Sequence, residues 1–142
     1  MLQDAAVNRR LITLNQPMKL AATIIRTLMG LLFLFASITY LFNLIPPPPL
    51  SGNVKLFMDG MLATGYMMTL IKITELSCGV AFVANRFVPL ASVVIAPIIV
   101  NISFFHLIVD QSGLPVAIFL VFANSFVAYS NWAKYKPMLA AK

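Results

Sequence analysis

Two charged side chains inside an otherwise apolar stretch are the first candidates for chemistry in this chain. Lys72 and Glu75 are three residues apart, so they share one face of a helix. Charges within a membrane-spanning helix are costly, usually face the protein interior and often have a function. Two interpretations stay open. Either Glu75 is a buried carboxyl that carries a proton, or it is the counter-ion of a Lys72 that extends toward the lipid head groups.

The single histidine of the chain is the next candidate. Asp110 follows His106 by four residues, and this spacing predicts that the two pair on one helix face. A lone histidine in a membrane serves as a structural hydrogen-bonding residue, as a proton relay or as a hydrogen-bond donor to a quinone. Asn101, on the same segment, is a candidate for interhelical hydrogen bonding. With one histidine and one cysteine, Cys78, the sequence predicts no metal site.

The segments that hold these residues are too apolar for a soluble domain. Of the 142 residues, 61% are hydrophobic and 10% are charged, whereas a soluble domain has about 25% charged residues. Between Thr27 and Ala133 the charged side chains are Lys55, Asp59, Lys72, Glu75, Arg86 and Asp110. Long uncharged stretches predict membrane spans and exclude a soluble enzyme or a nucleic-acid-binding module.

Four spans are predicted, at residues 27–45, 66–84, 87–109 and 114–132. The proline run at 46–49 cannot continue a helix, because proline lacks an N–H group. Pro89 and Pro115 fall in first turns, where that loss is harmless, and Pro97 is expected to kink the third span. Side chains predicted to join helices or to anchor at the membrane interface are Asn124, Ser125, Tyr129, Trp132 and Tyr135.

The segment 51–65 between the first two spans is predicted to be a short amphipathic helix at the outer surface. Its apolar face comprises Val54, Phe57, Met58, Met61 and Leu62. Lys55 and Asp59 lie on the opposite face, four residues apart, and are expected to pair weakly. The helix either packs against the spans or forms a lid over a cavity between them.

The basic residues predict the orientation. All Lys and Arg residues except Lys55 and Lys72 lie on one side of the predicted spans, so the positive-inside rule places both termini in the cytoplasm. We therefore expect a basic cytoplasmic flank (1–26), a membrane domain (27–132) and a cytoplasmic tail (133–142) in the cell membrane. The first span exceeds the about 7–15 residues of a signal-peptide core, so we expect no cleavage.

Short motifs occur in a fixed order along the membrane part of the chain. They are Phe57-Met58, Thr64-Gly65-Tyr66, Ile71-Lys72, Glu75-Leu76, Gly79, Arg86-Phe87-Val88-Pro89-Leu90, Ala96-Pro97-Ile98, Asn101 and Phe105-His106-Leu107. This series resembles the DoxX-like family of small four-helix membrane proteins. The resemblance runs from about Arg26 to Tyr135.

The resemblance implies an association with quinone-linked oxidoreductases. The relatives that give the family its name are subunits of a thiosulfate:quinone oxidoreductase, and others are partners of oxidative-stress enzymes. Glu75 matches the acidic position of the family's second helix, and Asn101 and His106 match the polar positions of its third. We expect no additional thiosulfate-handling domain.

Together these features predict an all-α protein, a four-transmembrane-helix bundle with a short amphipathic helix in the first outer loop. The expected function is an integral membrane subunit that supports a quinone-linked oxidoreductase or another membrane redox complex and is not catalytic alone. The alternatives are a non-catalytic scaffold or assembly subunit and a small-solute or proton carrier. The expected partners are the lipid bilayer, other membrane subunits or further copies of the chain.

The same hypothesis names the candidate site residues. Glu75 and His106 are the candidates for catalysis. The candidates for binding a cofactor, for which a quinone is the leading choice, are Tyr66, Lys72, Glu75, Asn101 and His106.

Overall fold

All regular structure in the chain is helical within residues 2–139, which the computed structural model describes; side chains are described for residues 18–137. The helices are α1 (Leu2–Leu41), α2 (Gly52–Ala63), α3 (Met67–Val83), α4 (Val88–Phe104), α5 (Leu114–Ser130) and α6 (Trp132–Leu139). A π-helical turn, η1 (Phe105–Val109), continues α4, and a 3-10 turn, η2 (Gln111–Gly113), leads into α5. The prediction of an all-α protein is confirmed.

The helices are those of a membrane protein in length and composition. Long apolar helices occur at Met18–Leu41, Val88–Val109 and Gln111–Ser130. Helices α2 and α3 meet the same criterion only as a pair, and they are bent by 89° relative to each other. Residues 2–139 therefore contain three candidate spans, or four if the bent pair is one span. Large apolar side chains such as Phe35, Val100 and Phe122 are exposed on the outer faces, as expected for helices in lipid.

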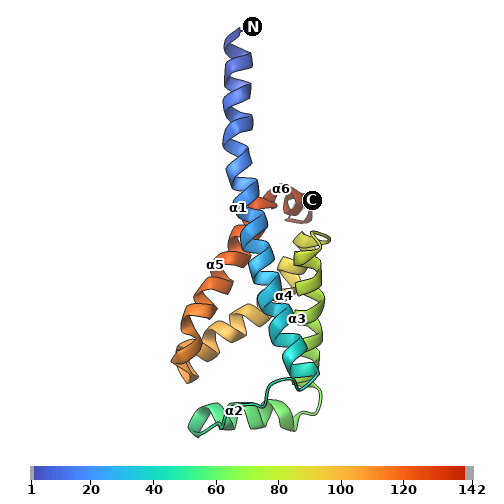
Figure 1. Cartoon of the computed structure of the whole chain (residues 1–142), viewed down its shortest axis with the longest axis vertical. Coiled ribbons are helices and arrows are strands. Elements are labelled where there is room, and N and C mark those ends of the chain that lie inside the picture. The colour runs from blue at the N-terminus through green and yellow to red at the C-terminus, as the bar shows by residue number, and fades with distance from the viewer. Residues whose placement is uncertain (1, 140–142) are drawn as a thin grey trace.

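The four long helices pack in the cyclic order α1, α3, α4, α5 (Figure 1). The N-terminal part of α1 extends well beyond the other helices. Helix α2 lies across the opposite end, on the same side as the connection between α4 and α5. The turn between α3 and α4 and the helix α6 therefore share one end of the molecule, and α2 and the α4–α5 connection share the other.

Helices α1 and α3 approach each other closely where they cross. A Cβ atom on Gly30 would lie 2.9 Å from the Phe82 Cβ and 3.1 Å from the Gly79 carbonyl oxygen. A Cβ atom on Gly79 would lie 3.0 Å from the Gly30 carbonyl oxygen. Small residues let helix backbones approach in this way, so these two glycines set the spacing of α1 and α3. The core around them comprises Met29, Phe33, Cys78, Phe82, Val88, Ala91, Ile95, Ile99, Leu120, Ala123 and Val127.

Helix α1 ends at Leu41, earlier than the predicted boundary at residue 45. Asn43 and Asn85 both adopt left-handed backbone, with φ of 50° and 55°. After each asparagine, the next N–H donates to the carbonyl five residues earlier, at 3.0 Å in both cases. This is the hydrogen bond of a Schellman motif, with asparagine in the position that glycine usually takes. The asparagine, rather than the proline run, therefore ends the first helix.

The other predicted boundaries are close to the observed ones. The expected helices at 66–84 and 87–109 correspond to Met67–Val83 and to Val88–Val109, of which the last turn is π-helical. Pro89 and Pro115 do lie in first turns, as predicted. The amphipathic helix predicted within 51–65 is α2.

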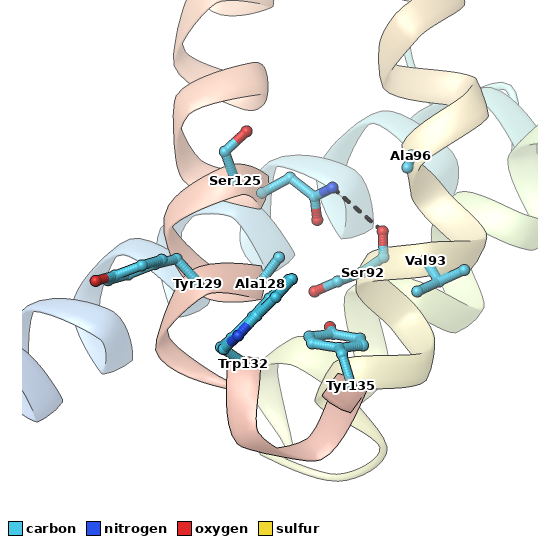
Figure 2. Close-up of a pocket in the computed structure, with 9 residues that line it drawn as sticks. Ser92, Val93, Ala96, Ser125, Ala128, Tyr129, Trp132 and Tyr135 are labelled. Atoms are coloured by element: carbon cyan, nitrogen blue, oxygen red, sulfur yellow. Dashed lines mark hydrogen bonds between the residues drawn. The ribbon is translucent and has the colours of Figure 1, made fainter. Parts of the chain in front are cut away.

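The segment after α5, expected to be a simple tail, contains helix α6. Tyr135 on α6 is buried, and its hydroxyl donates a hydrogen bond to the Pro89 carbonyl at 3.0 Å. Figure 2 shows Tyr135 and Trp132 lying next to Ser92 of α4. Helix α6 is thereby folded against the end of α4.

Candidate functional site

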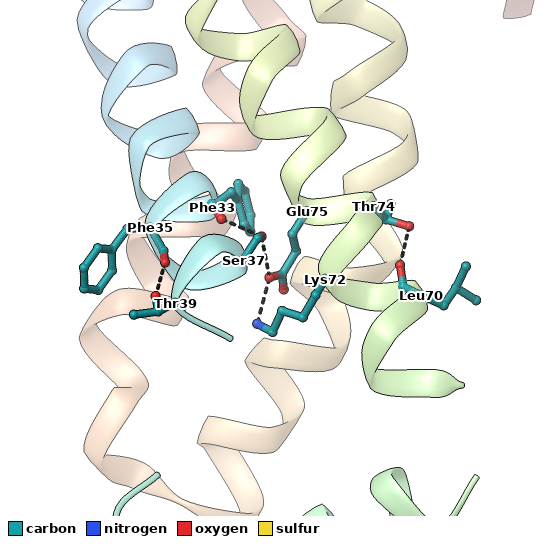
Figure 3. A network of polar contacts seen from close by, with 8 residues as sticks. All are labelled: Phe33, Phe35, Ser37, Thr39, Leu70, Lys72, Thr74 and Glu75. Atoms are coloured by element: carbon teal, nitrogen blue, oxygen red, sulfur yellow. Dashed lines mark hydrogen bonds and ion pairs between the residues drawn. The ribbon is translucent and has the colours of Figure 1, made fainter. Parts of the chain in front are cut away.

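Lys72 and Glu75 form an ion pair between α1 and α3 (Figure 3). The Lys72 Nζ lies 2.8 Å from the Glu75 Oε2. The side chains are 16% and 4% exposed, respectively, and both point toward Ser37 of α1. The prediction that the two residues share one face of the helix is confirmed.

Helix α1 supplies two further contacts to this ion pair. The Ser37 hydroxyl is 3.4 Å from the Glu75 Oε2 and 2.6 Å from the Phe33 carbonyl oxygen. Since a hydroxyl has one proton, its main bond is the shorter one to the carbonyl. The Lys72 Nζ also lies 5.9 Å from the centre of the Tyr40 ring, within the range of a cation–π contact. The two charges thus form a neutral unit enclosed by the two helices.

His106 occupies the turn between α4 and α5. Its Nδ1 is 2.8 Å from the backbone carbonyl oxygen of Asp110. Because a carbonyl only accepts, Nδ1 is the donor in this contact. The ring lies over Gly113, where an added Cβ would be 2.1 Å from the His106 Cε1. Only glycine leaves space for the imidazole at this position.

The prediction that the side chains of His106 and Asp110 pair is therefore wrong. The imidazole contacts the backbone carbonyl of Asp110 and not its carboxylate. The helix becomes π-helical at Phe105–Val109, and Asp110 is extended, with φ −140° and ψ 98°. The Asp110 carboxylate accepts instead from the Ser112 hydroxyl at 2.9 Å and from the Ser112 N–H at 3.1 Å. These two hydrogen bonds lower the pKa of Asp110, and the nearby His106 adds a smaller contribution in the same direction.

Among the described residues, none of the other candidates forms a hydrogen bond or an ion pair with Lys72 or Glu75. Tyr66 precedes α3 and is exposed, and Asn101 is exposed on α4. Within residues 18–137, no ion pair joins His106 to Glu75. The described residues also contain no group of three or more His, Cys, Asp and Glu side chains that could hold a metal. The structure therefore brings together Lys72 and Glu75 alone among the candidates.

The sequence did not reveal the contact between Arg26 and Asn85. Arg26 was expected in the basic flank, but it lies buried in α1, where its Nη1 donates to the Asn85 Oδ1. Asn85 thus ends α3 with its backbone and binds α1 with its side chain. Nothing in the sequence links two residues so far apart along the chain.

Two cavities lie between α4 and α5, away from the ion pair. The larger, of about 610 Å³, is bounded also by α6 and is lined by residues that include Ser92, Asn124, Trp132 and Tyr135. The second, of about 510 Å³, is lined mainly by apolar side chains. Asn124 has the interhelical role predicted for it, because its Nδ2 donates to the Ser92 carbonyl at 3.2 Å.

Comparisons with known proteins give no family assignment. No protein-family model matches the chain, and no curated protein or solved structure is significantly similar to it. The resemblance to the DoxX-like family therefore depends on the sequence motifs alone.

Proposed function

We propose that the chain is a multi-pass integral membrane subunit that supports a quinone-linked redox complex and does not catalyse the redox step itself. The observation that carries this proposal is the enclosed ion pair of Lys72 and Glu75. Glu75 is the buried carboxylate among residues 18–137, and it is neutralised within the contact of two helices. The ionisable group best placed for chemistry thus joins α1 to α3. The quinone-linked partner is taken from the family resemblance.

The proposal includes four spans with both termini in the cytoplasm of the cell. In this arrangement α3 makes the second crossing, and α2, bent by 89° relative to it, lies at the outer surface. Lys19, Arg86 and Lys134 then belong to the cytoplasmic end, and Lys55 lies at the outer end. This distribution follows the positive-inside rule.

A proton or small-solute carrier is the second candidate function. The observation in its favour is the burial of Glu75, which is 3% exposed, within an apolar helix. A carrier requires Glu75 to exchange its proton, whereas a supporting subunit requires only that the charges cancel. A scaffold for a complex without redox chemistry also requires only that the two charges cancel. It differs from the proposed redox subunit only in its partners.

Gentle purification of the tagged chain tests the proposal. We expect the purified material to contain other membrane subunits with a bound redox cofactor and to reduce an added quinone analogue. An unrelated four-span protein with the same tag is the control. Stoichiometric partners without any redox cofactor would instead support the scaffold, and the chain without any partner would contradict a subunit role.

A further inference from the structure

The larger cavity has the features of a site for a small lipophilic molecule. It has a volume of about 610 Å³ and lies between α4, α5 and α6. Most of its wall is apolar or aromatic, with a few polar groups, which is the usual make-up of a ligand pocket. Trp132 and Tyr129 are half or more exposed, so the cavity reaches the surface of the helices where lipid would lie. A ligand dissolved in the bilayer can therefore enter from the side.

Two buried polar atoms in the wall lack hydrogen-bond partners. They are the Ser92 hydroxyl and the Asn124 Oδ1. Ser92 is 2% exposed, and Figure 2 shows its hydroxyl directed toward Trp132 and Tyr135. The orientation of the Asn124 amide is fixed, because its Nδ2 donates to the Ser92 carbonyl. A buried polar atom without a partner is costly and indicates a missing partner at that place.

The chemistry of the two atoms defines what the partner must carry. The Asn124 Oδ1 is an acceptor only, so it needs a donor. The Ser92 oxygen retains lone pairs even where its proton is directed toward the Tyr135 oxygen, so it also accepts. With the Ser92 proton directed to Tyr135, a ketone or an ether, which can only accept, would leave both oxygens without a donor. A hydroxyl group placed between the two oxygens has a proton that it can donate to either of them.

We propose that this cavity binds a lipophilic molecule whose ring carries a hydroxyl group, held between Ser92 and Asn124 and packed against Trp132. The aromatic side chains of the wall fit a flat ring, and the open side fits an apolar substituent that extends into the bilayer. The proposal does not depend on the redox role of the chain.

Trp132 provides a direct measurement at the site, because it is the one tryptophan of the chain. The purified full-length chain in nanodiscs is titrated with 4-bromophenol or with 4-bromoanisole, since bromine quenches tryptophan fluorescence on contact. The two probes differ in a single O–H group. We expect saturable quenching with an affinity about tenfold higher for the phenol, the effect of hydrogen bonds to otherwise unpaired atoms.

Two variants test whether the difference in affinity between the phenol and the anisole depends on the side-chain oxygens of Ser92 and Asn124. Asn124→Leu and Ser92→Ala should each reduce the preference for the phenol, and Ser92→Ala should fold well because it removes an unpaired hydroxyl. Ser77→Ala, the same change on α3 in a different cavity, is the control and should keep the preference. A third probe, 4-bromocyclohexanol, tests which kind of hydroxyl group the cavity binds. Saturable binding equal to that of the phenol indicates a sterol-like alcohol. Weaker binding indicates a phenol.

Two results would overturn the proposal. Equal or unsaturable quenching by the phenol and the anisole would show that water, rather than a ligand hydroxyl, satisfies the two atoms. A preference for the phenol that persists in both Asn124→Leu and Ser92→Ala would show that the probe binds elsewhere near Trp132.

Discussion

At the scale of single residues, the ion pair of Lys72 and Glu75 is the feature on which the functional account depends. The spacing of the two residues predicts their contact, because positions three apart meet on one helix face. Their neighbours Ser37 and Tyr40 could not be predicted, since they belong to another helix and no local pattern links the two segments. The sequence therefore indicates the pair, and only the structure shows that it is enclosed.

Removal of one charge of this pair should destabilise the protein. Glu75→Gln leaves a buried lysine without a partner, and we expect the free energy of unfolding to fall by about 3 kcal/mol. This value is at the lower end of the range for a broken buried pair, because Lys72 is partly exposed. The double variant Lys72→Met, Glu75→Gln should regain most of that stability and the activity of the complex. Thermal unfolding in detergent and activity of the complex are the two measurements.

A matched control is the ion pair of Lys55 and Asp59 on α2, whose side chains are about half exposed. Lys55→Met with Asp59→Asn should change the stability little, since exposed pairs contribute little. A stable Lys72→Met, Glu75→Gln double variant without activity would contradict the supporting role and favour the carrier.

The turn at Asp110 should respond to acid. Because hydrogen bonds from Ser112 lower the folded-state pKa of Asp110, the carboxylate stabilises the turn above its unfolded pKa of about 3.9, and this contribution is lost as the pH falls through the folded value. Ser112→Ala should raise the pKa of Asp110, as measured by NMR titration. An unchanged midpoint would show that the hydroxyl does not hold the carboxylate.

At the scale of helices, apolar runs and prolines predict three long helices to within a few residues. The C-terminus of α1 and helix α6 were not predicted. The first depends on the left-handed conformation of Asn43, which competes with the more conspicuous proline run. The second depends on Tyr135 reaching α4, a contact between distant segments.

The crossing of α1 and α3 should not tolerate a larger residue at Gly30. Gly30→Ala places a Cβ against Phe82 and the Gly79 backbone, and overpacking of this kind costs about 1–3 kcal/mol. Gly60→Ala on α2 is the control, because no atom lies within 4 Å of its added Cβ. Both variants gain similar helix propensity, so the difference between their unfolding temperatures isolates the clash. Equal temperatures would mean that the helices are not in contact there.

Helix α6 should be held to α4 by one side-chain hydrogen bond. Tyr135→Phe keeps the ring and removes the donor to the Pro89 carbonyl, at a cost of about 1 kcal/mol. Hydrogen exchange of the α6 amides should become faster, while Tyr129→Phe, at an exposed residue, should leave it unchanged. Equal exchange in the Tyr135 variant would place α6 away from α4.

At the scale of the whole molecule, the cyclic packing of α1, α3, α4 and α5 depends both on local sequence features and on contacts between distant segments. The apolar segments and the charges of the residues that flank them are local features of the sequence and could be predicted. Contacts such as Arg26 with Asn85, and the cavity between α4, α5 and α6, arise from packing between segments far apart in sequence. The number of membrane crossings could be predicted only in part, because α2 and α3 meet the criterion for a span only as a bent pair.

Reporter fusions test the central claim, a four-span protein with both termini in the cytoplasm. A reporter that is active in the cytoplasm and one that is active only after export are fused after Lys142, after Arg86, near Gly52 and near Ser112. The account predicts cytoplasmic signals after Lys142 and Arg86 and exported signals near Gly52 and Ser112. An exported signal after Lys142, with the N-terminal flank in the cytoplasm, would show an odd number of crossings and contradict the account.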